Sequence, residues 1–171
     1  YDFKTGSDAE TVLYHYMTKG VGSFMDYNGM YAFAIYDSHK KELYIVRDKT
    51  GEKPLYYTQT DSFFAFASEI KALLKLKKPV LNDKCISYEA YEFNVGEATL
   101  FKDIYSLMPG DYIKIDRNMS AVKHSYWKIW DNLIDVPDNL KKIESKLTDL
   151  IIDAIKLRTK NCVHSYGTFV S

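Results

Sequence analysis

The first candidate for chemistry is a carboxylate at the start of a predicted helix. Asp8 follows Ser7 in "TGSDAE". A carboxylate in the first turn of a helix stabilises the helix dipole. Beside a cleft, the same carboxylate could bind an ammonium group through a charge-assisted hydrogen bond. The pattern leaves both roles open for Asp8.

The second candidate is the loop "VRDKTGEKPLYY", in which Arg47 and Asp48 end a predicted strand. Gly51 allows a tight turn, and Pro54 begins the next strand. One interpretation is a structured loop held by an Arg–Asp pair. The other is a loop that shapes a site or a domain interface, because loops carry function disproportionately.

Several other kinds of site are not indicated. The sequence contains no G-x-G-x-x-G, Walker A, H-E-x-x-H or C-x-x-C motif. Cys85 and Cys162 share no spacing with histidine or with another cysteine, so we expect buried thiols and no metal site. We also expect surface or structural roles for the four scattered histidines, which are His15, His39, His124 and His164.

A predicted helix over residues 7–19 positions Asp8. Ser7 and Glu10 match the capping-box pattern S-x-x-E, and Gly20 ends the helical periodicity. This places the Asp8 carboxylate in the first helical turn.

Two hairpins follow the helix. The first joins 30–36 to 43–46 through the polar turn "DSHKKE", and the second joins 55–58 to 63–67 through "QTDS". The 30–36 strand is apolar on both faces. A strand of this kind is covered on both faces, which predicts an inner layer in a multi-layer domain.

Shorter elements complete the β-rich part of the chain. Ser68 can cap a helix that reaches Leu76, and residues 83–93 form another short helix. A strand at 112–115 is predicted to pair with "SAVKHSYW" across the "RNMS" turn.

The character of the sequence changes after residue 127. Residues 128–137 are expected to be a linker anchored by Trp130, and 138–159 show helical periodicity with Asp138 as the cap. The terminal "YGTFVS" reads as a strand. A β-rich unit over 1–127 is therefore followed by a helix and one strand that open a second, different unit.

Composition indicates a globular protein. Hydrophobic residues make up 46% and aromatic residues 15% of 171 residues, and 23 basic residues balance 23 acidic ones. No global charge favours nucleic acid, and no apolar stretch is long enough to span a membrane. We expect a cytoplasmic protein. The start at Tyr1 without methionine is what we would expect of an internal segment or a processed chain.

Six stretches in order resemble the glutamine-hydrolysing asparagine synthetase family. They are "TGSDAE", "NGMYAFAIYD", "VRDKTGEKPLYY", "FASEIKALL", "TLFKDIYSLMPGDYIKID" and "GTFVS". The resemblance implies an α+β chain. Residues 1–127 would be the C-terminal part of a class II glutaminase domain, an αββα N-terminal-nucleophile sandwich. Residues 128–137 would be a linker, and 138–171 the first helix and strand of an α/β ATP-pyrophosphatase domain.

The resemblance also implies roles for particular residues. Asp8 corresponds to the carboxylate that binds the α-amino group of glutamine, and Met30 to a residue lining an ammonia tunnel. Arg47, Asp48 and Gly51 match an "RD-x-x-G" loop near the domain junction, with an architectural role.

At the other end of the chain, the resemblance implies nucleotide chemistry. Val170 and Ser171 match the strand end that leads into a pyrophosphate-binding loop, whose backbone amides approach phosphate closely. The parent enzyme would use ATP and Mg²⁺ to activate aspartate as an adenylate, and ammonia from glutamine would displace AMP. None of these cofactors would be bound by the segment alone.

The chain departs from the family pattern in two places. The family nucleophile is an N-terminal cysteine, and neither Cys85 nor Cys162 matches it, so no catalytic residue is assigned and the segment alone is expected to be inactive. "CVHSYGTFVS" has Ser165 where proline is common.

Two alternatives remain. One is a relative that amidates a different carboxylate acceptor. The other is a non-catalytic module without the nucleophile. Its exposed sheet edges could pair with those of a second copy and form a homodimer.

Overall fold

The computed structural model describes residues 1–86, 96–136, 139–160 and 167. The chain forms two compact units, Tyr1–Asp131 and Asn132–Ser171. The division between them falls inside the 128–137 segment predicted as a linker. The predicted strand at 166–171 lies outside the described residues, apart from Gly167.

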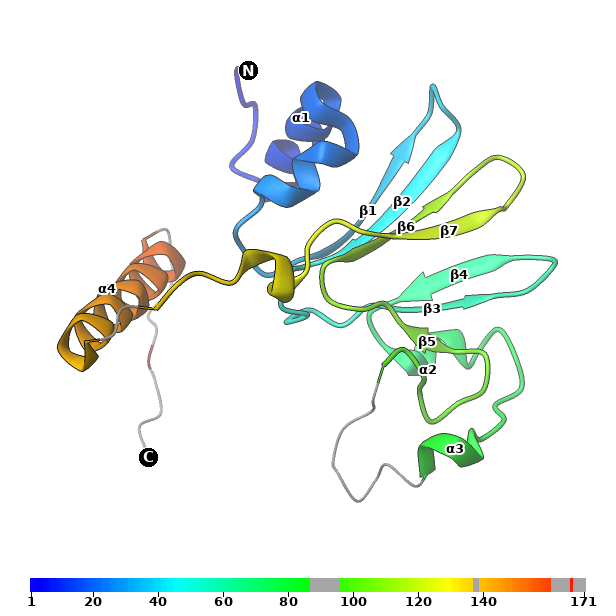
Figure 1. The fold of residues 1–171 in the computed structure, drawn as a ribbon. Coiled ribbons are helices and arrows are strands. Elements are labelled where there is room, and N and C mark those ends of the chain that lie inside the picture. The colour runs from blue at the N-terminus through cyan, green and yellow to red at the C-terminus, as the bar shows by residue number, and fades with distance from the viewer. Residues whose placement is uncertain (87–95, 137–138, 161–166, 168–171) are drawn as a thin grey trace. The chain divides into compact units, whose positions relative to one another are not determined.

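The first unit contains two antiparallel sheets, as Figure 1 shows. A four-stranded sheet has the order β1-β2-β6-β7, with β1 at Ala32–Asp37, β2 at Glu42–Arg47, β6 at Asp111–Ile115 and β7 at Ala121–Ser125. A three-stranded sheet has the order β4-β3-β5, with β3 at Tyr56–Gln59, β4 at Phe64–Ala67 and β5 at Tyr105–Ser106. These sheets, with the helices around them, confirm the α+β class and all three predicted hairpins.

The helices of the first unit are mostly short. They are α1 (Asp8–Lys19), the 3₁₀ helix η1 (Gly20–Asp26), α2 (Ile70–Leu73), α3 (Asp83–Ile86) and the 3₁₀ helix η3 (Ile129–Asn132). α2 packs against β3 and β4. Its N-cap is Glu69, so the prediction that Ser68 caps this helix was wrong. Of the predicted 83–93 helix, residues 87–95 lie outside the described residues.

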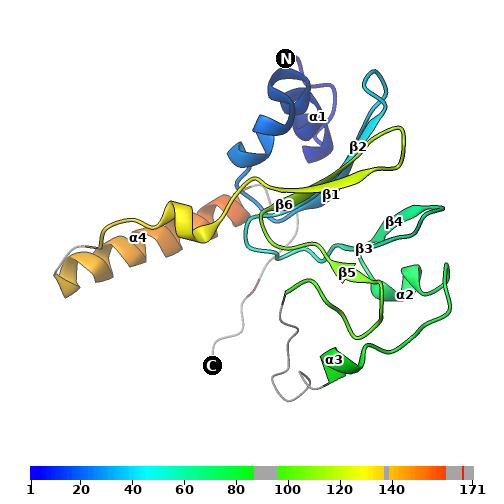
Figure 2. The ribbon, with the colours of Figure 1, turned by 45° about the vertical axis from the view of Figure 1, so that its right-hand side comes forward.

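The four-stranded sheet is covered on two sides within this unit. On one face, Tyr16 of α1 and Phe24 of η1 pack with Tyr44 and Val46 of β2. On the other face, Ile45 of β2 packs with residues of the second sheet region. Figure 2 shows α1 and the second sheet on opposite sides of the four-stranded sheet. β2 is therefore covered on both faces, as the sequence predicts for the neighbouring 30–36 strand.

The same prediction was wrong for one face of β1. Ile35 is buried, but Ala34 and Tyr36 are exposed. The reason is that β1 is an edge strand, which pairs with β2 alone.

The cap of α1 is simpler than the predicted capping box. The Ser7 hydroxyl accepts a hydrogen bond from Ala9 N–H at 3.3 Å, as an N-cap does. The Glu10 carboxylate turns instead to the backbone N–H groups of Lys4 (2.9 Å) and Thr5 (2.7 Å). Glu10 thereby fixes the segment before the helix, and the reciprocal half of the box is wrong.

The second unit contains α4 (Leu140–Thr159). Its N-cap is Asn139, whose Oδ1 accepts from the N–H groups of Lys141 and Lys142, so the prediction of Asp138 as cap was wrong. In the segment before α4, the predicted anchor Trp130 is 75% exposed, which contradicts an anchoring role. No helix among the described residues is long and apolar enough to cross a membrane.

Asp37 makes the turn between β1 and β2 sensitive to pH. Its Oδ1 accepts the N–H groups of His39 and Lys40, and its Oδ2 accepts the Tyr16 hydroxyl at 3.0 Å. The backbone N–H of Lys40 is the main cause that lowers the pKa of Asp37 to about 2. The pKa in the unfolded chain is higher, about 3.9.

A carboxyl whose pKa is lower in the folded state stabilises the fold above its unfolded pKa, and the stabilisation is lost as pH falls through the folded value. We therefore expect the denaturant midpoint of the wild type to fall more steeply between about pH 4 and pH 2 than that of Asp37→Asn. Urea titrations across this range measure the difference, and parallel curves for the two proteins would contradict it.

Candidate functional site

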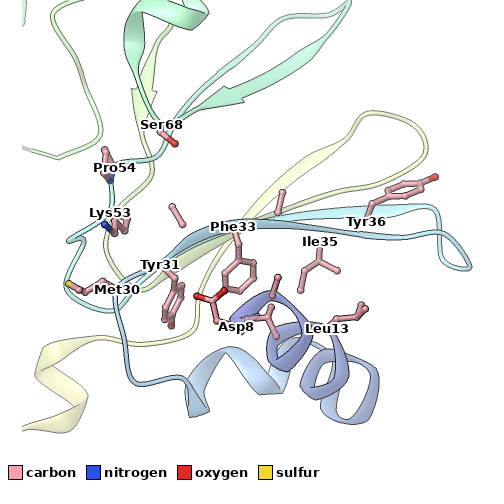
Figure 3. Close-up of a pocket in the computed structure, with 14 residues that line it drawn as sticks. Asp8, Leu13, Met30, Tyr31, Phe33, Ile35, Tyr36, Lys53, Pro54 and Ser68 are labelled. Carbon is pink, nitrogen blue, oxygen red and sulfur yellow. The ribbon is translucent and has the colours of Figure 1, made fainter. Parts of the chain in front are cut away.

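A groove of about 600 Å³ runs along β1 in the first unit. Figure 3 shows Asp8 and Leu13 of α1 on one side, and Lys53, Pro54 and Ser68 on the other. The strand itself forms the floor, with Tyr31 to Tyr36 contributing side chains. Most of these lining side chains are apolar, and few charges face the space.

Asp8 is the acidic group of this groove. It is the first residue of α1, it is exposed, and its carboxylate reaches from the helix toward Tyr31 and Phe33 (Figure 3). Among the described residues, no donor is found for its side-chain oxygens. The carboxylate is therefore available to a cation or an ammonium group from solution.

Met30 lies at one end of the groove and is 46% exposed. Its thioether points away from Asp8 in Figure 3. The structure therefore brings two predicted residues, Asp8 and Met30, to one groove. Lys53 at the rim was not predicted as a site residue, because a single lysine in a polar loop carries no distinctive sequence signal.

Arg47 ties the loop after β2 to the start of the second sheet. Its guanidinium donates to Gly51 O at 2.7 Å, to Lys53 O at 2.8 Å and to Leu107 O at 2.6 Å. A fourth bond reaches Ser106 Oγ at 3.1 Å. The partners are three carbonyl oxygens and a hydroxyl, not the carboxylate of Asp48, so the hypothesis of an Arg–Asp pair is wrong.

Asp48 is fully buried, with 0% exposure. Oδ1 accepts the N–H groups of Thr50 (3.1 Å) and Glu52 (2.9 Å), and Oδ2 accepts those of Tyr31 (3.2 Å) and Lys53 (3.0 Å). A buried charge is tolerated when hydrogen-bond donors surround it. Burial raises the pKa of this carboxyl, but the backbone donors outweigh that effect and leave the pKa below its usual value.

Gly51 has the left-handed conformation that the sequence suggested, with φ of 71°. A Cβ at this position would lie 2.6 Å from Pro109 Cγ and 3.3 Å from the Arg47 guanidinium. The close approach explains why the loop can fold back on Arg47. Arg47, Asp48 and Gly51 thus form one hydrogen-bonded unit beside the groove.

A pair of tyrosines behind the groove was missed by sequence reasoning. The Tyr31 and Tyr126 hydroxyls lie 2.9 Å apart, and the Tyr126 hydroxyl donates to Arg47 O at 2.6 Å. Burial raises the pKa of both hydroxyls, so they remain neutral donors. The two residues are 95 positions apart, and no local pattern connects them.

The predicted nucleotide site cannot be placed in the same way. Val170 and Ser171 lie outside the described residues. Within the described part of the chain, no group of three or more histidine, cysteine, aspartate or glutamate residues could hold a metal ion.

Comparison with known proteins assigns most of the chain to a family. The sequence profile of the glutamine amidotransferase domain matches residues 1–127. This chain belongs to the glutamine amidotransferase domain family. The domain thus includes both sheets, α1, the groove and the Arg47–Asp48 loop.

Named relatives of this chain include two asparagine synthetases [glutamine-hydrolyzing] of Bacillus subtilis (strain 168). One, numbered 2, is 36% identical over 141 residues, which is 77% of this chain and 19% of that protein. The other, numbered 1, is 30% identical over 173 residues, covering 100% of this chain and 27% of that protein. These two relatives confirm the predicted resemblance to the glutamine-hydrolysing asparagine synthetase family.

A third relative has a different name. Amidase chry2 of Gibberella zeae is 27% identical over 168 residues, which is 94% of this chain and 24% of that protein. The chain therefore spans about a fifth to a quarter of the length of these three relatives. The relatives of this chain therefore carry two different names, asparagine synthetase and amidase.

Proposed function

We propose that this chain is part of a glutamine-dependent asparagine synthetase and that its groove binds the nitrogen donor. Glutamine would be hydrolysed to glutamate and ammonia, with water as the second reactant. Aspartate would react with ATP and Mg²⁺ to give an aspartyl adenylate and pyrophosphate, and the ammonia would then displace AMP from the adenylate to give asparagine. The named relatives and the family match support the donor half of this reaction.

The observation that carries the proposal is the unpartnered Asp8 carboxylate on the wall of the groove. Glutamine carries an α-ammonium group, and a carboxylate binds ammonium through charge-assisted hydrogen bonds. The apolar floor formed by Phe33 and Ile35 would exclude water from the contact and strengthen it. Met30 would line the path by which ammonia leaves the site.

A second candidate function differs only in the acceptor. Amidase chry2 covers nearly the same part of this chain as the synthetases do. The groove contacts the donor in either case, so the two functions share Asp8. Product analysis with aspartate and with other carboxylic acids as acceptors separates them, and asparagine as the sole product supports the synthetase.

Replacing Asp8 by asparagine is expected to raise KM for glutamine about 10- to 100-fold, the size of one charge-assisted hydrogen bond. The expected change in kcat is small, because the ammonium contact is the same in the ground state and in the transition state. Glutamate release by the natural protein, measured against glutamine concentration, gives both constants.

The matched control is Glu10→Gln, which removes a second carboxylate from the first turn of α1. Glu10 holds the backbone of Lys4 and Thr5 and does not line the groove. Its KM for glutamine is expected to stay at the wild-type value. Equal KM values for the two variants would show that Asp8 does not bind glutamine and only stabilises the helix dipole.

A further inference from the structure

Asp48 connects the floor of the groove to its rim, two parts that no strand pairing joins. Tyr31 lies at the start of the floor, and Lys53 lies on the rim. The backbone N–H groups of both residues donate to the same oxygen, Asp48 Oδ2, at 3.2 and 3.0 Å. One buried atom therefore sets the spacing between floor and rim.

The other bonds of Asp48 make this connection rigid. Its backbone N–H donates to Tyr31 O at 2.9 Å, and its backbone O accepts Gly110 N–H at 2.9 Å. With two more donors on Oδ1, the side chain has no freedom to rotate. A carboxylate that accepts four backbone N–H groups organises the loop in a way that no neutral side chain of the same size can.

Tyr31 is anchored a second time, from the opposite end. Its hydroxyl lies 2.9 Å from that of Tyr126, which in turn donates to Arg47 O. The backbone of Tyr31 is thus held by Asp48 and its ring by Tyr126. Tyr126 does not line the groove, so it acts on the groove through the two residues that its hydroxyl contacts, Tyr31 and Arg47.

We propose that Asp48 is a positioning residue for the groove and that Tyr126 supports it, together fixing Tyr31 and the Lys53 rim at the spacing that the bound ligand requires. Neither residue touches the ligand. Displacements of about 1 Å in a binding wall can reduce catalytic efficiency by up to two orders of magnitude, so a group outside the site can have a large effect. The ligand named in the test, glutamine, rests on the proposed function.

The first test is the variant Asp48→Asn in the natural protein, compared with Asp116→Asn. Asp116 also accepts two backbone N–H groups, in the β6–β7 turn away from the groove. We expect KM for glutamine to rise about tenfold in Asp48→Asn with kcat changed less than about threefold, and neither constant to change in Asp116→Asn. Equal constants in the two variants would overturn the proposal.

A second readout does not depend on the substrate. Amide hydrogen exchange at Tyr31 and Lys53 is expected to accelerate in Asp48→Asn and to stay at wild-type rates in Asp116→Asn. Unchanged exchange at these amides would overturn the proposal regardless of the kinetics. If the wild type hydrolyses no glutamine, the proposed function fails, and the exchange rates alone then decide whether Asp48 sets the groove.

A milder pair of variants keeps the test valid if Asp48→Asn does not fold. Tyr126→Phe removes one hydroxyl behind Tyr31, and Tyr57→Phe removes a hydroxyl that bonds Glu97 outside the groove. We expect Tyr126→Phe to raise KM for glutamine by a few-fold, with no change in Tyr57→Phe. Loss of kcat without a change of KM in Tyr126→Phe would show a purely structural role and contradict the proposal.

Discussion

Replacing Gly110 by alanine is expected to lower the free energy of unfolding by about 3–4 kcal/mol, the sum of backbone strain and a backbone clash. Gly110 has φ of 72°, where a side chain is unfavourable. A Cβ there would lie 2.3 Å from the carbonyl oxygen of Trp127, and backbone cannot move aside as a flexible side chain can. The N–H groups of Tyr126 and Trp127 both donate to Gly110 O, so any shift also breaks these bonds.

Gly96→Ala is the matched control for this prediction. Gly96 has nearly the same φ, 75°, but no atom of the described residues lies within 4 Å of the position its Cβ would take. Only the conformational strain remains, and we expect a loss of about 1 kcal/mol. Urea unfolding of the two variants measures the difference. Similar losses for both would mean that the approach of Trp127 to Gly110 is not tight in solution.

Replacing Phe24 by alanine is the second large prediction. Phe24 is fully buried in η1, and its ring lies 5.3–6.3 Å from five other aromatic rings. These rings belong to Tyr16, Phe33, Tyr44, Tyr112 and Tyr126. Truncation leaves a cavity that rigid rings fill poorly, so we expect a loss of about 3–5 kcal/mol.

Phe66→Ala serves as the comparison, since Phe66 is 38% exposed on β4. There the loss is expected to stay below about 1–2 kcal/mol, because the removed ring is only partly out of water. Thermal unfolding followed by near-ultraviolet circular dichroism reports both variants. If Phe66→Ala proved the more damaging, the aromatic cluster around Phe24 would not be the main core of the unit.

Local patterns predicted the elements of the fold well. The α1 helix and the hairpins around "DSHKKE", "QTDS" and "RNMS" follow from apolar periodicity and turn residues, which act within a few positions. The errors concern features decided elsewhere in the chain. Burial of β1 depends on whether a strand lies beside it, and the exposure of Trp130 depends on what packs against it, so neither could be inferred locally.

The site was predictable in part for the same reason. The helix start placed Asp8 correctly, but only the fold shows that its carboxylate faces β1 across a groove. The loop motif identified Arg47 and Asp48 and suggested that they pair with each other. Their adjacency in sequence was misleading, because the Arg47 side chain binds carbonyl oxygens and the Asp48 side chain binds backbone N–H groups of the loop. Tyr126 could be linked to Arg47 only through the three-dimensional structure.

The order of strands in the four-stranded sheet has a consequence for how the polypeptide emerges during synthesis. β2 and β6 are neighbours, but residues 48–110 lie between them in the chain and include the three strands of the second sheet. The β1–β2 hairpin can form early, whereas its neighbour is translated some 60 residues later, a delay of several seconds at ribosomal rates of about 5–20 residues per second. During that interval both edges of the nascent hairpin stay open. Slow translation before codon 111 would therefore lengthen the exposure of an aggregation-prone ribbon, and synonymous changes there would alter the yield of folded protein without altering a single side chain.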